Sequence, residues 1–587
     1  MQNYATLLGV RLTNLPLKNT LCKTLQHFFR QFKVSSEFLS DAALGPVSEF
    51  KARRIAGRVY DLVRQKHSAA SICRGRSRAR TFRGVKISVL VPLPTQKWND
   101  ETAGHLLNRA AFGGTPGEIE AARKKGLAAM VRELVDANTD AVTVPPPAWA
   151  HPRNIRAQRM EINAAKDQGQ NFQEKAREVH MMERENILDL RRWWLERMMT
   201  GRAPLLEKMT LFWHGHFATS VQKVKDAYWM WLQNDTLRRN ALGNFATLVR
   251  KMSRDPAMMI YLDLHQSRKE HPNENWAREL MELFTVGIGN YTEEDVRASA
   301  RAFTGYRIDD TTQQFRFAPN QQDLGAKTFM GHTGPLNGDN IIEILIQRPV
   351  CAQFIGRKLW RFFVEDEPSQ EIVDHIAGRV RAHNFEMRPL LREIFSSAEF
   401  YSERVIQTQI KSPVQYIVQA SKLLETALPS PIVTQNAMRQ MGQILFAPMN
   451  VKGWDGGKAW ITTSTLLFRY NFANYLINGD AMVRHGAPAR VKNPDPGFRQ
   501  SVVQRQQLAN RIKCNPIDIS KFVPNELRNR PRELVDLLSR RFFQSRPPEK
   551  EVNTFVQFLE SRNPDTSDET MRELVHLMMS TPQFQLA

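Results

Sequence analysis

The sequence has few cysteines, no long apolar run and none of the common catalytic signatures. Four cysteines are scattered over 587 residues without a CxxC pair, so neither a disulfide framework nor a thiolate metal site is predicted; they are Cys22, Cys73, Cys351 and Cys514. The longest apolar stretch, near residues 87–94, is far too short to cross a bilayer, so no transmembrane segment is predicted. GxSxG, HExxH, GxGxxG and EF-hand patterns are absent, which leaves the common hydrolase, metalloprotease and oxidoreductase classes without motif support.

The chain is strongly basic, and the excess of positive charge is concentrated near its N-terminal end. The formal net charge is +22, and residues 1–90 contribute +13 of it, from 17 Lys and Arg against four Asp and Glu. No signal peptide is evident in this segment, because it lacks a sustained apolar h-region. Two interpretations stay open: a basic extension that binds nucleic acid through residues 51–86, or a poorly ordered leader outside the physiological protein. We favour the leader, because the segment contains no nucleic-acid-binding motif.

Beyond this segment the pattern is helical. Apolar residues recur at helical spacing from Thr102 onward, and Thr115-Pro116 and Thr292 are typical helix starts. We therefore predict an all-α fold, a large multi-helical globular body. The chain is expected to comprise a basic and disordered extension (1–95), a main helical domain (96–483), a linker (484–500) and a C-terminal helical region packed on the main domain (501–587).

A minor β insertion is expected within the main domain. Residues 306–308 and 314–317 alternate in polarity, which predicts a small β-hairpin. Glycines recur in the residues that follow, up to Gly338. This recurrence predicts a long Gly-rich loop.

The most informative polar segment is 273–284. Asn273 is typical of an N-cap, and four residues of the helix that follows share one face at i, i+3, i+4 and i+7: Asn275, Arg278, Glu279 and Glu282. Charged stripes are usually solvated, with arginine paired to a nearby glutamate. The alternative is functional, because two carboxylates one turn apart can act as a metal pair or an acid–base pair, each raising the pKa of the other.

Two further segments contain candidate ligands. In Phe212-Trp213-His214-Gly215-His216-Phe217 an extended loop would project His214 and His216 to the same side, as metal ligands do, and imidazole suits divalent transition metals. The alternative is that either histidine is a buried hydrogen-bonding residue in an aromatic cluster. In residues 323–332, Asp323 and Lys327 lie in a Gly-rich loop that either orders a site or is an ordinary surface loop.

A fourth candidate is Trp454, within Asn450-Val451-Lys452-Gly453-Trp454-Asp455-Gly456-Gly457. An aromatic ring presented between glycines can stack on a sugar ring, or it can fill a gap in the core. The sequence leaves both interpretations open.

Taken in order, these segments resemble the bacterial domain of unknown function 1800 family, over nearly the whole chain after about residue 96. The matching blocks are His105–Gly113, Phe212–Phe217, Asn273–Gly287, Tyr291-Thr292, Ala300–Tyr306, Asp323–Gly331, Arg357–Phe363, Lys411–Pro413, Met441–Gln443 and Asn450–Trp454. The resemblance implies a bacterial protein with an export signal, a periplasmic or envelope location, and a sulfatase-like partner protein encoded nearby. It implies no established activity and no catalytic residues. This sequence departs from the exported form because it has no recognisable signal.

The leading hypothesis is an envelope-associated hydrolase of polysaccharide or another polar polymer. Its catalytic residues are predicted as Glu279, Glu282 and His214, with a divalent transition metal held by His214, His216 and Glu279. Its substrate-binding residues are predicted as Asn273, Asn275, Arg278, Asp323, Lys327 and Trp454. The alternatives are a non-catalytic scaffold or binding protein that works with the sulfatase-like partner, and nucleic-acid binding through the basic N-terminal segment.

Overall fold

The computed structural model describes residues 90–137, 144–167, 172–479, 514–562 apart from 544 and 546, and 566–587. These residues form two compact units, a larger one of residues 90–461 with 585–587 and a smaller one of residues 462–584. Almost all of the predicted basic extension and the whole predicted linker lie outside the described residues, and so does the nucleic-acid-binding segment proposed for residues 51–86.

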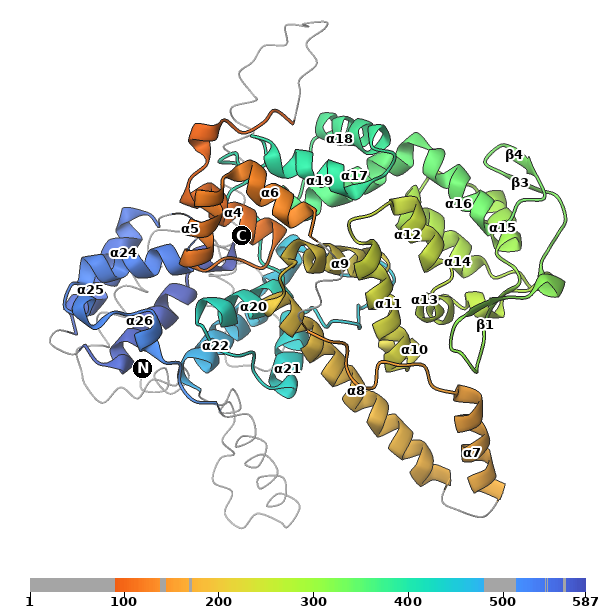
Figure 1. Ribbon diagram of the computed structural model, residues 1–587, viewed down its shortest axis with the longest axis horizontal. Helices are drawn as coiled ribbons and strands as arrows, with labels where there is room; N and C mark the ends of the chain where they lie inside the picture. The colour runs from red at the N-terminus through yellow and green to blue at the C-terminus, as the bar shows by residue number, and fades with distance from the viewer. Residues whose placement is uncertain are drawn as a thin grey trace, which may run out of the picture. The chain divides into compact units, whose positions relative to one another are not determined.

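The predicted all-α fold is confirmed, since helices dominate both units and strands are few and short (Figure 1). The helices of the larger unit are α4 (Asp100–Ala110), α5 (Pro116–Lys125), α6 (Leu127–Val135), α7 (Ile155–Asp167), α8 (Phe172–Thr200), α9 (Pro204–His216), α10 (Val221–Val224), α11 (Ala227–Asn240), α12 (Phe245–Met252), α13 (Pro256–Tyr261), α14 (Glu274–Glu279), α15 (Glu293–Ala302), α16 (Gly338–Gln347), α17 (Pro349–Phe363), α18 (Gln370–Ala382), α19 (Met387–Ser396), α20 (Pro413–Leu423) and α21 (Pro431–Met441). The helices of the smaller unit are α22 (Thr463–Asn478), α24 (Pro531–Phe542), α25 (Glu549–Glu560) and α26 (Asp568–Met579).

Several helices begin at the capping residues that the sequence predicted. Thr115 accepts a hydrogen bond from the Glu118 backbone N–H, and Pro116 is the first residue of α5. The Thr292 hydroxyl accepts from the backbone N–H of Asp295 at the start of α15. These side chains satisfy backbone N–H groups that have no partner within the helix, which is why such residues fix helix starts.

Two small antiparallel hairpins are present among the described residues. The predicted hairpin is confirmed: β1 (Tyr306–Ile308) pairs with β2 (Phe315–Phe317). A second pair, β3 (Lys327–Phe329) and β4 (His332–Gly334), lies where the sequence predicted only a Gly-rich loop. Met330 and Gly331 connect these strands, both with positive φ, as a tight two-residue hairpin turn requires.

Helix α9 forms the centre of the core in the larger unit. Every side chain from Leu205 to His214 is buried, which is typical of a helix surrounded by others. It packs against α4, α6, α8 and α11 (Figure 1). The Trp213 ring stacks on Phe245 with centroids 5.6 Å apart. The two predicted histidine ligands therefore lie at the end of a core helix.

A buried carboxylate balances two arginines inside this core. Glu207 of α9 accepts hydrogen bonds from Arg197 Nε (2.8 Å), Arg238 Nε (2.9 Å) and Trp194 Nε1 (2.9 Å). Burial pushes the pKa of Glu207 upward, but Arg238 and Arg197 outweigh burial and hold that pKa below its ordinary value. Glu207 is therefore ionised in the folded protein at neutral pH.

None of the described helices is both long enough and apolar enough to cross a membrane. The longest of them, α8, has 29 residues and carries charged side chains along its length. In the smaller unit α22 packs on α26, and α24 packs on α25. Its core contains the buried side chains of Leu538, Phe555 and Met571.

Candidate functional site

His214 and His216 lie in the last turn of α9 and not in a loop. Successive residues of an α-helix are about 100° apart, so two residues separated by one project to nearly opposite sides. The prediction that both imidazoles point to the same side is therefore wrong. Burial of α9 on all sides keeps the chain helical through Gly215, where the sequence alone indicated a break.

The His214 ring lies among aromatic side chains and holds a neighbouring loop. Its Nε2 accepts the backbone N–H of Phe446 at 3.0 Å, and its ring lies 5.1 Å from Trp194 and 5.6 Å from Trp454. Burial lowers the pKa of His214 to about 3, so the ring is neutral at physiological pH. Its Nδ1 has no hydrogen-bond partner among the described residues.

The His216 ring points instead to the segment that follows α14. Leu280–Thr285 forms a π-helical turn, η3, whose wider hydrogen-bonding pattern leaves carbonyl groups for other partners. His216 Nε2 donates to the Phe284 carbonyl at 3.1 Å, and Nδ1 lies 3.0 Å from the ammonium of Lys358. Lys358 also donates to the Leu283 carbonyl at 3.2 Å. His216 and Lys358 therefore stabilise the end of the π-helical turn together.

Burial governs the protonation of His216 and Lys358. It lowers the pKa of Lys358 to about 8, and the nearby Arg361 adds to the effect. Burial also lowers the pKa of His216 well below its ordinary value, with a further contribution from Lys358. A neutral His216 that donates through Nε2 has a lone pair on Nδ1, and that lone pair accepts the Lys358 hydrogen bond.

Gly215, between the two histidines, is the point where a second loop meets α9. A Cβ atom at Gly453 would lie closer than 3.0 Å to the Gly215 carbonyl oxygen, and Gly453 has φ of +87°. Only glycine combines this conformation with so close an approach of two backbones. The contact brings Trp454 against Gly215 and His214, while Lys452 comes close enough to lower the pKa of Glu279.

Glu279 and Glu282 lie beside this loop and close to each other. Glu279 ends α14, and Glu282 lies in the π-helical turn one helical turn later. Burial raises the pKa of Glu279, and the adjacent Glu282 raises it further, against smaller opposing effects of Arg278 and Lys452. Glu282 accepts a 2.8 Å hydrogen bond from the Tyr291 hydroxyl. The two carboxylates are thus partly buried in different hydrogen-bonding surroundings.

Two tyrosines complete this cluster. Burial raises the pKa of Tyr261, and the charge of Glu279 adds to the effect. Burial also raises the pKa of Tyr291, with its hydrogen bond to Glu282 as the next cause. We call Tyr261, Glu279, Glu282, Tyr291 and Lys452 the paired-glutamate site.

Three predicted substrate ligands on the same helix have partners within the protein. Arg278 forms two hydrogen bonds with Glu293 (2.7 and 2.8 Å), the first residue of α15. Asn273 is the N-cap of α14 as predicted, accepting from the backbone N–H groups of Asn275 and Trp276. The Asn275 amide donates to the Leu262 carbonyl at 3.4 Å.

Asp323 and Lys327 organise their own loop, away from the paired-glutamate site. Asp323 accepts from Arg301 Nε at 2.7 Å, and Lys327 donates to the Asp323 and Gly325 carbonyls at 2.7 and 2.8 Å. Arg301 lies eight residues after Glu293 on α15, about 12 Å along the helix. The loop and the Arg278–Glu293 pair therefore lie at opposite ends of α15.

The predicted metal ligands do not come together. Within the described residues, no group of three or more His, Cys, Asp or Glu side chains is arranged to hold a metal ion. The three predicted metal ligands His214, His216 and Glu279 therefore do not form a metal site in this structure. The reason is that the two imidazoles project from different sides of α9 into separate environments. His216 also has both ring nitrogens engaged.

The sequence interpretation missed residues whose types gave no signal of their own. Lys358 and Tyr291 lie in blocks that carry the family resemblance, yet nothing in their local spacing indicated a partner. Lys452 and Gly453 immediately precede Trp454, and the prediction for this loop concerned Trp454 alone. Gly453 is the residue that a pattern of glycines around an aromatic could have identified.

Comparison with known proteins gives a family and no activity. No curated protein and no solved structure matches the chain. The family model described as "Protein of unknown function (DUF1800)" matches residues 105–586. This range includes α9, the paired-glutamate site and the loop of Gly453, and it confirms the resemblance seen in the sequence. The chain belongs to the DUF1800 family.

Proposed function

We propose that the protein is a hydrolase of polysaccharide or another polar polymer, and that the paired-glutamate site performs general acid–base chemistry. The observation that carries the proposal is the difference between two neighbouring carboxylates. Burial and Glu282 raise the pKa of Glu279, whereas Glu282 accepts a hydrogen bond from Tyr291. Carboxyl groups whose surroundings separate their protonation are the usual basis for an acid and a base in one site.

In the proposed reaction Glu279 is the acid and Glu282 the base. The Glu279 proton passes to the leaving oxygen as its bond to carbon breaks. Water attacks that carbon, and Glu282 takes the proton that the water loses. Transfer of this proton from Glu282 back to Glu279 restores the starting state. Tyr291 positions the Glu282 carboxylate through its 2.8 Å hydrogen bond.

Substrate recognition in this proposal comes from the loop of Gly453. Trp454 is partly buried and lies beside Gly215, so part of its ring is available to stack on a sugar ring. Lys452 supplies a charge opposite Glu279. Asn273, Asn275, Arg278, Asp323 and Lys327 act in this proposal as residues that position the surrounding backbone.

The test compares glutamate variants at matched positions. Glu279→Gln and Glu282→Gln are expected to reduce reducing-end release from a polysaccharide panel at least 100-fold, consistent with general acid–base contributions of roughly 10²–10⁴. Glu274→Gln, an exposed residue of α14, is the control and is expected to retain full activity. The assignment would be refuted if the Glu279 and Glu282 variants released reducing ends as fast as the wild-type protein. No release from any polymer tested would count against the hydrolase.

A non-catalytic scaffold or binding protein is the second candidate, and a specific observation favours it. Several polar side chains that were predicted to bind substrate instead bind backbone or ion-pair partners, as Arg278 and Lys327 do. On this hypothesis the protein works in the bacterial envelope with a sulfatase-like partner, as the family resemblance implied. Co-purification of that partner with wild-type protein and equally with Glu279→Gln would favour the scaffold.

A further inference from the structure

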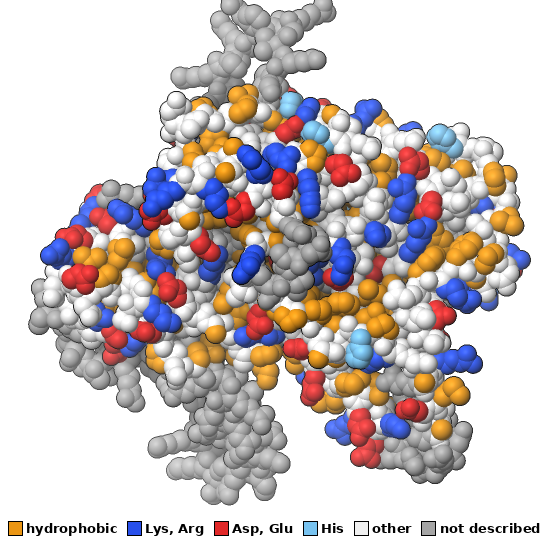
Figure 2. All heavy atoms as spheres, in the orientation of Figure 1, with side chains coloured by type: hydrophobic (Ala, Val, Ile, Leu, Met, Phe, Trp, Pro, Cys, Tyr) orange, Lys and Arg blue, Asp and Glu red, His pale blue; other side chains and the backbone are white. Residues whose placement is uncertain are grey.

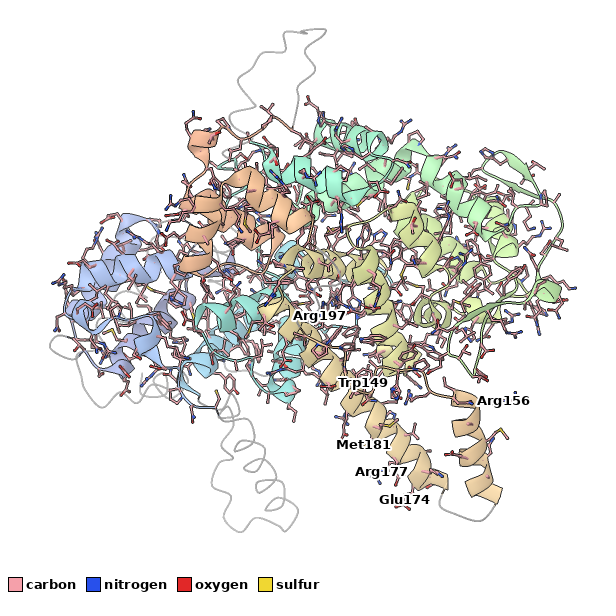
Figure 3. The ribbon with its side chains drawn as sticks, in the orientation of Figure 1. Trp149, Arg156, Glu174, Arg177, Met181 and Arg197 are labelled. Atoms are coloured by element: carbon pink, nitrogen blue, oxygen red, sulfur yellow. The ribbon has the colours of Figure 1, made fainter. Side chains whose placement is uncertain are left out.

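The feature that the proposed function leaves unexplained is a helical hairpin formed by α7 and the first half of α8. Figure 1 shows it extending from the rest of the larger unit, and Figure 3 labels Glu174, Arg177 and Met181 on its outer half. Its base is firmly held. Glu183 accepts from Arg153 Nη2 and from the Ala227 backbone N–H, the latter at 2.8 Å.

One side of this segment of α8 is covered and the other is exposed. Ala176, Val179 and Glu183 are partly buried and recur at i, i+3 and i+7, the spacing of one helix face. The opposite face is exposed, and Met181 lies near its centre with 46% of its surface accessible. Met181 is therefore the apolar side chain that this face presents.

Charged residues lie in two lines beside Met181. At about 100° per residue, Arg177 and Arg184 lie about 40–60° to one side of Met181, and Glu178 and Glu185 lie about 40–60° to the other. All four are exposed. Each pair is seven residues apart, the spacing that keeps like charges on one edge of a helix contact. Figure 2 shows acidic, basic and apolar side chains close together on this hairpin.

These four charges have no partner within the part of the chain that the structure describes. Among the described residues, no ion pair or side-chain hydrogen bond involves Arg177, Glu178, Arg184 or Glu185. Elsewhere on the larger unit exposed charges commonly pair, as Lys124 does with Glu120. The outer face of α8 therefore presents a basic edge and an acidic edge, one on each side of Met181, and no described residue pairs with either edge.

We propose that this face binds the same face of a second copy of the chain, with the two α8 helices parallel. A two-fold axis parallel to the helices brings Met181 against Met181 of the partner subunit. It also places the basic edge of each copy against the acidic edge of the other. An antiparallel pair would place basic edge against basic edge and acidic against acidic, so these four edge charges favour the parallel arrangement.

The expected dimer is weak and sensitive to salt. A contact of a few helical turns buries less than the roughly 800 Å² per partner that is typical of stable complexes. Exposed ion pairs contribute little individually and are screened by salt. Self-association is therefore expected to rise with protein concentration and to decrease at least threefold between low salt and about 0.5 M salt.

Charge reversal in the full-length chain tests the proposal by sedimentation velocity at low salt. Arg177→Glu/Arg184→Glu makes both edges acidic, and Glu178→Arg/Glu185→Arg makes both edges basic, so each variant alone is expected to be monomeric. An equimolar mixture of the two variants is expected to associate at least as strongly as wild type, because every acidic edge then meets a basic one. Arg348→Glu/Arg381→Glu, a matched change at exposed residues elsewhere, is expected to leave association unchanged.

Oxidative cross-linking tests which face of α8 makes the contact. Met181→Cys is expected to form a disulfide-linked dimer in good yield, identified by mass spectrometry of the linked peptides because the chain has four native cysteines. Lys175→Cys, about 120° away on the same helix, is expected to cross-link at least fivefold less. A wild-type protein that is monomeric at every concentration would overturn the proposal. Association that neither charge-reversal variant weakens would do so as well.

Discussion

Replacing Gly453 with alanine tests whether the close approach of its loop to α9 builds the candidate site. Gly453 has φ of +87°, and its Cα faces the Gly215 carbonyl. An added Cβ atom would lie closer than 3.0 Å to the Gly215 oxygen, 3.2 Å from the Gly215 carbonyl carbon and 3.5 Å from its Cα. All three atoms are backbone atoms of a buried helix, so the loop has to move.

The cost has two parts that a second variant separates. A non-glycine residue at this φ costs roughly 1–2 kcal/mol wherever it occurs. The overlap with backbone adds the cost of overpacking, typically about 1–3 kcal/mol. Gly289→Ala isolates the first part, because Gly289 has a similar φ of +84° and nothing within 4 Å of its added Cβ atom.

Two measurements test how Gly453→Ala affects the stability of the protein and the exposure of the loop. Chemical denaturation is expected to give a loss of about 2–5 kcal/mol in the free energy of unfolding for Gly453→Ala, against about 1–2 kcal/mol for Gly289→Ala. Hydrogen exchange is expected to accelerate in residues 450–457 of Gly453→Ala alone, since the loop has lost its contact with α9. Equal stability losses in the two variants, with unchanged exchange in the loop, would refute the close-approach argument.

Three further predictions concern buried charges. Glu207→Gln is expected to lower the free energy of unfolding by about 3–5 kcal/mol, because two buried arginines lose their counter-charge. Glu343→Gln at the surface is the control and is expected to cost less than about 1 kcal/mol. Urea titrations measure both losses. Since its folded pKa is lowered, the stabilisation from Glu207 is present above about pH 4.5 and is lost as pH falls through the folded pKa. Lys358→Met is expected to cost about 1–3 kcal/mol by leaving a carbonyl unpaired. Because burial lowers the pKa of Lys358 to about 8, wild-type stability rises from about pH 8 to 10.5 relative to this variant, as denaturation at several pH values would show. The acid role of Glu279 predicts that kcat falls as pH rises through its raised pKa, a limb absent in Glu279→Gln.

Local chemistry made several elements predictable. Thr115, Asn273 and Thr292 cap helices as the sequence indicated, because a capping side chain bonds backbone only two or three residues away. The β1–β2 hairpin followed from alternating polarity. The β3–β4 hairpin was missed, since its turn uses Met330-Gly331 in place of the usual Asn-Gly or Asp-Gly.

The candidate site depended on contacts between segments far apart in the chain. The proximity of Glu279 and Glu282 was predictable, because three residues on a helix bring side chains together. The roles of His214 and His216 were not. Whether Gly215 ends α9 depends on packing around the helix, and the two histidines bind partners at Phe446, Phe284 and Lys358.

The sequence by itself determined the helical fold, the helix starts, the family and the pairing of two carboxylates on one face. All of these depend on residue type and on spacings of a few positions. The tertiary structure alone decided that the histidines lie on different sides of a core helix, and that the loop of Gly453 contacts Gly215 of α9. Contacts between distant segments depend on how buried surfaces fit together, and the spacing of neighbouring residues does not predict that fit.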